Sequence, residues 1–471
     1  MYDEIQSTLA KKSINIIQGD IYDIIAIWKQ WYRGNVNDFH YYNVKLADGK
    51  ETQCERLTMN MPKKVCEDFA KLEWSEKVQI KLDDEAKEKE LWNILDSKKN
   101  NFSVMFPQFI EKTFALGTGA VVQYLVDDEV KIDYIDGDNV IPYKYDNGVI
   151  TGFVNLNQFT EGLRNKKKYY THLTYHEYDG VKYKKWNELY CSKDKNTLGR
   201  EVSFEDMFPK VKNPVEYETE VPHFQILKPN LANNLDFTTP MGMSIFGNHI
   251  DKFKSIDTKY DIFNKEFELG KKRILVDKSA IKSSPQVDTD GNITNITYFD
   301  KNDQVYQAIN GMESQPVKEI DFKLRHREFI ESINADLNYL SAGVGLGQNY
   351  YSFDASGVKT ATEVISENSD TYRAKVHHQI MVKDVLFDLI KVVMYLGGIE
   401  SKELEIIFDD SIIEDTNSIM DRGLKLLSSG AISKSKFMEK YLGYTEQEIT
   451  KELAKIKEEN KVITPDGLDF F

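Results

Sequence analysis

The 471-residue sequence is poor in cysteine, with only Cys54, Cys66 and Cys191. Their scattered positions form neither a metal-ligand spacing nor an even set for disulfides, so we expect reduced, structural thiols. The sequence contains no run of 18 or more apolar residues, which argues against a membrane-spanning helix. The first residues lack the basic-then-apolar layout of a signal peptide. These absences predict a soluble protein made in the cytoplasm, with no membrane partner.

Positive charge is also in short supply. There are 61 basic against 76 acidic residues, a formal net charge of −15. Proteins that bind nucleic acid tightly through its phosphates usually carry a basic surface, because counterion release supplies their affinity. The acidic balance therefore excludes a DNA clamp. It does not exclude a channel, since strong phosphate contacts would hinder DNA that has to slide.

Motifs for nucleotide chemistry are absent. The glycines Gly343, Gly345 and Gly347 invite a nucleotide-loop interpretation, but a dinucleotide fingerprint follows a strand, and the expected preceding element here is a helix. No Gly-x4-Gly-Lys-Ser/Thr sequence occurs. This argues against an ATP-driven motor, and the glycines predict a mobile or tightly turned structural loop.

Candidate metal ligands lack the spacing that metals require. Residues 288–292 resemble the start of a calcium loop, but Phe299 stands where a bidentate Glu is needed. His172 and His176 would lie roughly 13 Å apart on a strand. The acidic group Asp409, Asp410, Glu414 and Asp415 has no companion motif, so a solvated turn is the simpler interpretation. We therefore expect no metal, no cofactor and no catalytic residues.

Long helices and hairpins are present in this sequence. Apolar residues recur at helical spacing over 13–33, 244–269 and 318–342, and from 360 to 397 no Gly or Pro interrupts a helix of about 37 residues. Alternating apolar residues predict three β-hairpins, with strands at 121–126 and 130–135, 140–145 and 149–156, and 169–178 and 181–190. Residues 193–222 are expected to form a loop, a strand is expected at 403–408, and helices are expected from 416 onward, with Thr445 and Glu448 spaced as a capping box.

The helices at 244–269 and 318–342 bracket a small strand-rich insert at 270–316, like a stalk with a tip. Basic residues gather near this insert in an otherwise acidic chain, namely Lys265, Lys271, Lys272, Arg273, Lys318, Lys323, Arg325 and Arg327. They are interpreted either as an ordinary exposed helix surface or as a modestly basic stalk that faces DNA phosphates.

This arrangement resembles a tailed-phage portal protein, of the type found in phages and prophages of Gram-positive bacteria and similar to the portals of Listeria and Bacillus siphophages. The resemblance is carried by residues 57–72, 74–78 and 132–142, and above all by 343–372, where Lys359-Thr360-Ala361-Thr362-Glu363 is its most specific part. It implies an α+β portal-type fold with long stem helices, a wing rich in β-hairpins, a small α/β clip insert and a C-terminal helical crown.

The resemblance also implies a function. The family forms a dodecameric ring at one capsid vertex in the virion, assembled in the cytoplasm of the host bacterium. Through this ring double-stranded DNA is packaged and later ejected. Its expected partners are the terminase large subunit, then head-completion or adaptor proteins, and the major capsid and scaffolding proteins. No enzymatic activity is implied.

By region, the resemblance assigns the wing to 1–243, the stem helices to 244–269 and 317–342, the clip to 270–316, the tunnel loop to 343–358, the long helix and wing return to 359–415, and the crown and tail to 416–471. The loop residues Gly343, Gly345, Gly347, Gln348, Asn349, Tyr350 and Tyr351 would reach the DNA channel. None is basic, so the loop should position DNA without binding it tightly.

Two alternatives stay open. The chain could be the portal-like component of a defective prophage or tail-like particle. In a different class, it could be a metal-dependent nuclease or nucleotide-binding enzyme that uses the acidic group at 409–415 or the glycine loop.

Overall fold

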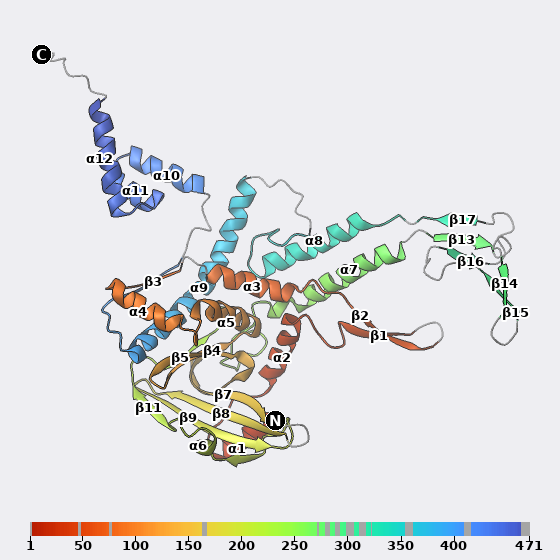
Figure 1. The fold of residues 1–471 in the computed structure, drawn as a ribbon, viewed down its shortest axis with the longest axis horizontal. Helices are drawn as coiled ribbons and strands as arrows, with labels where there is room; N and C mark the ends of the chain where they lie inside the picture. Colours follow the sequence, from red (N-terminus) through yellow and green to blue (C-terminus); the bar gives the residue numbers. More distant parts are fainter. Residues whose placement is uncertain are drawn as a thin grey trace. The chain divides into compact units, whose positions relative to one another are not determined.

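The structure is a computed structural model. It describes residues 2–45, 49–74, 78–162, 167–270, 273–277, 283–287, 293–297, 306–309, 317–321, 323–353, 361–408 and 416–462. The chain divides into two compact units, Met1–Val358 with Arg373–Phe408 and Lys359–Tyr372 with Asp409–Phe471. The first unit mixes helices with mainly antiparallel sheets (Figure 1), which confirms the α+β class.

Helices of the N-terminal part build the apolar centre of the first unit. They are α2 (Asp20–Tyr32), α3 (Met61–Glu73), α4 (Glu85–Leu95) and α5 (Phe102–Leu116), whereas the buried residues of α1 (Tyr2–Lys11) belong to a second, smaller cluster. The sequence predicted one helix over 13–33, but α2 begins only at Asp20, and α1 was not predicted. The difference arises because the backbone N–H of Ile17 donates to the carbonyl of Pro142 (3.1 Å), which holds the preceding residues out of a helix.

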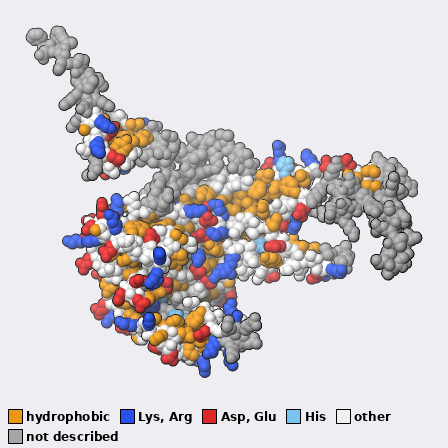
Figure 2. All heavy atoms as spheres, viewed as in Figure 1, with side chains coloured by type: hydrophobic (Ala, Val, Ile, Leu, Met, Phe, Trp, Pro, Cys, Tyr) orange, Lys and Arg blue, Asp and Glu red, His pale blue; other side chains and the backbone are white. Residues whose placement is uncertain are grey.

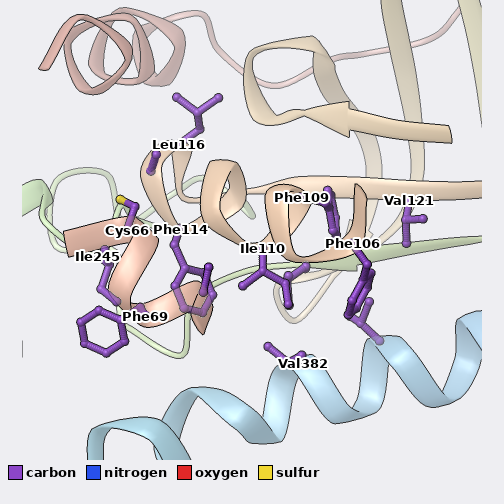
Figure 3. Close-up of a cluster of buried hydrophobic side chains, with 14 of the residues drawn as sticks. Cys66, Phe69, Phe106, Phe109, Ile110, Phe114, Leu116, Val121, Ile245 and Val382 are labelled. Atoms are coloured by element: carbon purple, nitrogen blue, oxygen red, sulfur yellow. The ribbon is translucent and has the colours of Figure 1, made fainter. Parts of the chain in front are cut away.

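Helix α5 is the centre of the core. It lies against the long helix α9 (Ala361–Gly397), and the close-up in Figure 3 shows Val382 of α9 directed at Ile110 and Phe69 of α3 beside Phe114. All four side chains are buried in one hydrophobic cluster. The core therefore joins segments that are more than 200 residues apart in sequence.

Gly117 ends α5 in the left-handed region, at φ +78°. A Cβ at this position would lie 2.7 Å from the backbone carbon of Met243. Glycine is required here both by the positive φ and by the close approach of a second chain segment.

Two antiparallel sheets flank these helices. Strands β4 (Gly119–Val126) and β5 (Glu129–Asp136) pair with β12 (Phe224–Leu227). The larger sheet has the order β10-β9-β8-β7-β6, and β11 also pairs with β9. Its strands are β6 (Val140–Asp146), β7 (Val149–Glu161), β8 (Lys168–Tyr178), β9 (Lys182–Ser192), β10 (Arg200–Val202) and β11 (Val215–Glu218).

The three predicted hairpins are confirmed as β4–β5, β6–β7 and β8–β9. The loop predicted at 193–222 is wrong in part, because it contains β10, β11 and the short helix α6 (Phe204–Met207). Both strands are three or four residues long and pair with β9. Such strands form by completing a ladder that already exists, so their own sequence pattern is weak.

Helices α7 (Ile250–Leu269) and α8 (His326–Gly343) leave the helical core together and lead toward further strands (Figure 1). There β13 (Arg273–Asp277) pairs in parallel with β16 (Tyr306–Ile309) and antiparallel with β17 (Val317–Ile320), and β14 (Ser283–Val287) pairs with β15 (Ile293–Thr297). The prediction of a helix from 318 is therefore wrong at its start. Residues 317–320 complete a sheet edge, and the helix begins at His326.

Helix α9 has 37 residues, as the sequence predicted, and its residues belong partly to each unit. The strand expected near 403 is β18 (Leu404–Ile407), which pairs with β3 (Gln79–Leu82) in the first unit. The second unit contains α10 (Thr416–Ser428), α11 (Lys434–Leu442) and α12 (Glu446–Val462). The predicted capping box is confirmed, because the N–H of Thr445 donates to Glu448 Oε2 (2.9 Å) and the N–H of Glu448 to Thr445 Oγ1 (3.4 Å).

Candidate functional site

The helix pair α7 and α8 is the candidate site that the sequence singled out. Its inner side is apolar: Phe253 and Ile256 of α7 and Ile333 and Leu337 of α8 are buried in the main core. Further along, the ring of Phe263 lies 5.9 Å from that of Phe329. The pair is thus held together by buried aliphatic and aromatic side chains near the body and by an aromatic contact farther out.

Polar contacts brace the same two helices. Asp336 of α8 accepts a hydrogen bond from Ser255 Oγ (2.6 Å) and an ion pair from Lys259 Nζ (2.7 Å). Arg325, just before α8, forms a bidentate pair with Glu266 of α7 (3.0 and 2.8 Å). The guanidinium lowers the pKa of the Glu266 carboxyl below its usual value. These contacts fix the spacing and register of the two helices.

The outer side of the pair also carries large apolar side chains. Ile262 and Phe267 of α7 are exposed, and Tyr339 of α8 is 68% exposed. Figure 2 shows hydrophobic side chains gathered along α8 on the face in view. Each of the three keeps at least 44% of its surface exposed in the described part of the chain, so the pair presents apolar surface outward as well as inward.

The basic residues near the insert at 270–316 do not form one continuous patch. Lys265 is engaged within its own chain, bonded to Asp261 (2.5 Å) and to the hydroxyl of Tyr42 (2.9 Å), which raises its pKa. Arg325 is paired with Glu266. Lys318, Lys323 and Arg327 are exposed.

Arg273 lies in β13, and Lys271 and Lys272 lie outside the described residues. Of the eight basic residues interpreted either as an ordinary helix surface or as a stalk facing DNA, Lys318, Lys323 and Arg327 are therefore the ones whose described side chains are exposed and for which no ion pair is seen among the described residues.

The glycine-rich loop after α8 is tightly turned. Gly343 is the last residue of the helix, and a Cβ there would lie 2.6 Å from the ring of His249. The N–H of Leu346 donates to the carbonyl of Ser341 (2.9 Å), and Gly345 adopts φ +89°. Two of the predicted glycines thus serve close packing and a left-handed turn.

Only part of this loop is open to solvent. Val344, Leu346 and Tyr351 are buried, and the N–H of Tyr351 donates to Ser341 Oγ (3.1 Å). Burial raises the pKa of the Tyr351 hydroxyl far above its usual value. The hydrogen bond and the three buried side chains anchor the loop to the body.

Gln348, Asn349 and Tyr350 are three consecutive exposed residues at the tip of the loop, and Gly343, Gly345 and Ser352 are exposed as well. Asn349 has φ +63°, and the N–H of Tyr350 donates to the carbonyl of Gly347 (3.1 Å). Partial burial raises the pKa of Tyr350 to about 12, so its hydroxyl is neutral at pH 7. This tip offers hydrogen-bonding groups without charge. Residues 354–358 of the predicted tunnel loop lie outside the described residues.

Two buried carboxylates on α7 were missed by the sequence analysis. Asp257 accepts hydrogen bonds from Thr58 Oγ1 (2.9 Å) and the N–H of Met59 (2.9 Å), and it lies 3.2 Å from His40 Nε2. Asp261, one turn later, accepts from the N–H of Leu57 (3.2 Å). Acidic residues four apart on a helix usually indicate a face exposed to solvent. Only the tertiary structure shows that these two carboxylates accept hydrogen bonds from backbone N–H groups.

The histidines have structural surroundings. His172 and His176 both lie on β8, where His172 Nε2 is 3.0 Å from Asn187 Oδ1 and His176 Nδ1 is 2.8 Å from the hydroxyl of Tyr183. Burial lowers the pKa of His176 well below its usual value. In α9, burial between Phe69 and Phe114 lowers the pKa of His378 to about 4.

Within the described ranges, no group of three His, Cys, Asp or Glu residues is placed to hold a metal ion. The acidic residues 409–415 and the calcium-like residues 288–292 lie outside those ranges. Among the described helices, none is both long and apolar enough to cross a membrane.

The comparisons with known proteins address the whole chain. The profile of one protein family, described as phage portal protein, SPP1 Gp6-like, matches residues 16–466. A comparison with curated protein sequences finds no match. The family match covers the helix pair, the glycine-rich loop and the second unit alike.

Proposed function

Because the chain belongs to the SPP1 Gp6-like phage portal protein family, a structural and non-enzymatic component of the virion, we propose that about twelve copies form a closed ring at one capsid vertex. Double-stranded DNA passes through the centre of this ring during packaging and ejection. The ring is bound first by the terminase large subunit and afterwards by head-completion or adaptor proteins, and it is built in with the major capsid and scaffolding proteins.

The observation that carries this proposal is the outward apolar surface of α7 and α8. Ile262, Phe267 and Tyr339 leave apolar area in water, which a monomer would retain at a cost and which a neighbouring copy can cover. A ring of identical copies covers this area on every subunit and leaves no open end.

In this proposal α7 and α8 are the stem, and strands β13 to β17 belong to the clip that meets terminase and adaptor proteins. The N-terminal helices and the sheets up to β12 are the wing, and α10 to α12 are the crown. Residues 343–358 are the tunnel loop. The nuclease alternative rests on acidic residues outside the described ranges, and nothing in the described part of the chain favours it.

The loop geometry supports a specific contact with DNA. Gln348, Asn349 and Tyr350 are exposed and uncharged, so they can touch a sliding duplex through weak polar contacts. The buried side chains of Val344, Leu346 and Tyr351 hold this tip in place. The loop would therefore act as a fixed, low-friction guide.

The test is to measure nuclease-resistant DNA per capsid in particles built with variants of this tip. Replacing Gln348 and Asn349 together by Lys adds two positive charges per copy, and we expect slower packaging because DNA is then held by its phosphates. The control replaces the exposed turn residues Asp127 and Asp128, which also have positive φ, by Lys; this changes the charge by four units per copy, and normal packaging is still expected. Normal packaging with the tip variant would contradict the proposed channel position of the loop.

A further inference from the structure

The hairpin formed by β1 (Tyr41–Lys45) and β2 (Glu51–Glu55) stands apart from the sheets described above. Its strands pair only with each other, so within the described ranges neither outer edge has a partner. Residues 43–45 and 51–53 are exposed on both faces. An isolated two-stranded hairpin is marginally stable in water, which suggests that these edges and faces are covered in the assembled protein.

The base of this hairpin is nevertheless held firmly. The N–H of Arg56 donates to the carbonyl of His40 (2.7 Å), and Arg56 Nη1 donates to the carbonyl of Phe39 (2.7 Å). The guanidinium lies over the rings of Phe39 (4.2 Å) and Tyr42 (5.1 Å). The chain after β2 is then bound by the buried carboxylates Asp257 and Asp261 of α7, which were described above.

The hairpin thus combines exposed strand edges, unpaired within the described residues, with a base that is firmly held by α7. Burying two carboxylates is unfavourable unless their hydrogen bonds are satisfied, and here those bonds fix the direction in which the hairpin leaves α7. A fixed direction contributes little to a hairpin that ends in water. It is useful when the hairpin has to meet a surface at a set place.

The exposed side chains indicate what kind of surface this is. Asn43, Thr52 and Gln53 are uncharged and Val44 is 39% exposed, while the exposed charges are mixed in sign: Lys45 lies 4.0 Å from Glu51, and Lys50 and Glu55 are exposed as well. Without a cluster of basic residues the hairpin is unsuited to phosphates. Open strand edges with short polar and β-branched side chains are suited to the backbone and side chains of another protein.

We propose that the β1–β2 hairpin docks against a second copy of this chain, the next subunit of the ring. The inference rests on the proposed ring. It is favoured by continuity, because the hairpin is rooted on α7, whose exposed apolar side is assigned to the same subunit boundary. In a ring each subunit presents two different surfaces, so every copy donates one hairpin and receives another.

The experiment uses the full-length chain and measures the concentration at which half of it is assembled, by light scattering. Val44→Asp places a charge on the hairpin, and its matched control is Val181→Asp, at the exposed turn between β8 and β9, where valine is 63% exposed. We expect Val44→Asp to raise the half-assembly concentration by at least ~10-fold and Val181→Asp to leave it unchanged. Thermal unfolding of the dissociated subunits should be the same for both.

A second variant removes the hairpin without disturbing its base. Residues 44–52 are replaced by Asn-Gly, a two-residue turn that can close the directly opposed pair Asn43 and Gln53. Loss of rings with a folded subunit supports the inference. If both hairpin variants form rings like the wild type, the inference is overturned while the proposed portal function stands.

Two further outcomes are informative. If the wild-type chain itself forms no ring, either alone or in the presence of its scaffolding and capsid proteins, the inference and the proposed function fall together. If the hairpin variants form normal rings that are then not incorporated into capsid shells, the partner is a shell protein, and docking on a second copy is refuted.

Discussion

Tyr339 offers a quantitative test of how the subunits associate. It is 68% exposed on α8. Aromatic side chains bury roughly 150–250 Å² when fully covered, so a neighbouring copy could remove roughly 100–150 Å² of this residue from water. At about 25 cal/mol per Å² this amounts to about 3 kcal/mol per interface, a factor on the order of 10² in the association constant.

The perturbation is Tyr339→Ala in the full-length chain. Alanine favours the helix, and the side chain makes no core contact, so the free energy of unfolding of the subunit should change by no more than ~0.5 kcal/mol. Ring formation should weaken strongly. Size-exclusion chromatography with light scattering over a dilution series measures this, and chemical denaturation of the dissociated subunit checks its stability.

The matched control is Tyr145→Ala, an aromatic residue 44% exposed at the end of β6, for which we expect unchanged assembly. If Tyr339→Ala assembled at the same concentrations as the wild type, the outward apolar surface of α8 would not lie between subunits, and the reasoning from exposed apolar area would be refuted.

Three further predictions concern the single subunit. Burial lowers the pKa of His223 to about 4, below the value of about 6.5 in an unfolded chain, so protonation favours the unfolded state and stability should fall as the pH drops from about 6.5 to 4. In His223→Phe the urea midpoint should fall less over this pH range. An unchanged dependence of the urea midpoint on pH would contradict the buried, neutral state of His223. Asp336→Ala should lower the free energy of unfolding by about 1.5–3 kcal/mol, because Ser255 and Lys259 lose their shared acceptor, and a thermal midpoint equal to that of the wild type would show that the two helices need no polar brace. Gly117→Ala should lower the free energy of unfolding by at least ~2 kcal/mol, because alanine is strained at positive φ and its Cβ would contact Met243. Gly148→Ala has a similar φ of +77° but nothing within 4 Å, so it should lower the free energy of unfolding only by the ~1 kcal/mol due to φ. Equal losses of the two variants in chemical denaturation would refute the contact with Met243.

The elements that the sequence predicted well are those with local causes. The hairpin turns carry Asp127-Asp128, Asn147-Gly148 and Asp179-Gly180, and in the structure Asp127, Asp128, Asn147, Gly148 and Gly180 all have positive φ. Asp, Asn and Gly tolerate the left-handed region, so these residue types in the sequence directly indicate such turns. Helix α9 was equally predictable, because no Gly or Pro occurs between its first residue and Gly397, and such a long stretch favours one continuous helix.

The elements that were missed depend on distant partners. Residues 317–320 continue the apolar spacing of α8, yet they become β17 because β13 offers a free edge. The same holds for β10 and β11, which exist only beside β9. A local pattern cannot report an edge supplied by a segment elsewhere in the chain.

The candidate site was also predictable only in those features that have local causes in the sequence. The glycines located the turn after α8, and the uncharged residues at 348–350 are exposed as a contact with DNA would require. The burial of Val344 and Leu346 and the binding of backbone by Asp257 and Asp261 follow from tertiary contacts. Of the basic residues, sequence alone could not show that Lys265 and Arg325 are paired with acids on α7.

The central claim is that the chain closes into a ring, and native mass spectrometry of the purified wild-type protein tests it most directly. About twelve copies of 54.6 kDa predict a species near 655 kDa. On dissociation this species should give mainly monomers, and smaller closed rings should not dominate. A chain that stays at 54.6 kDa at all concentrations, and also in the presence of its scaffolding and capsid proteins, would contradict the account.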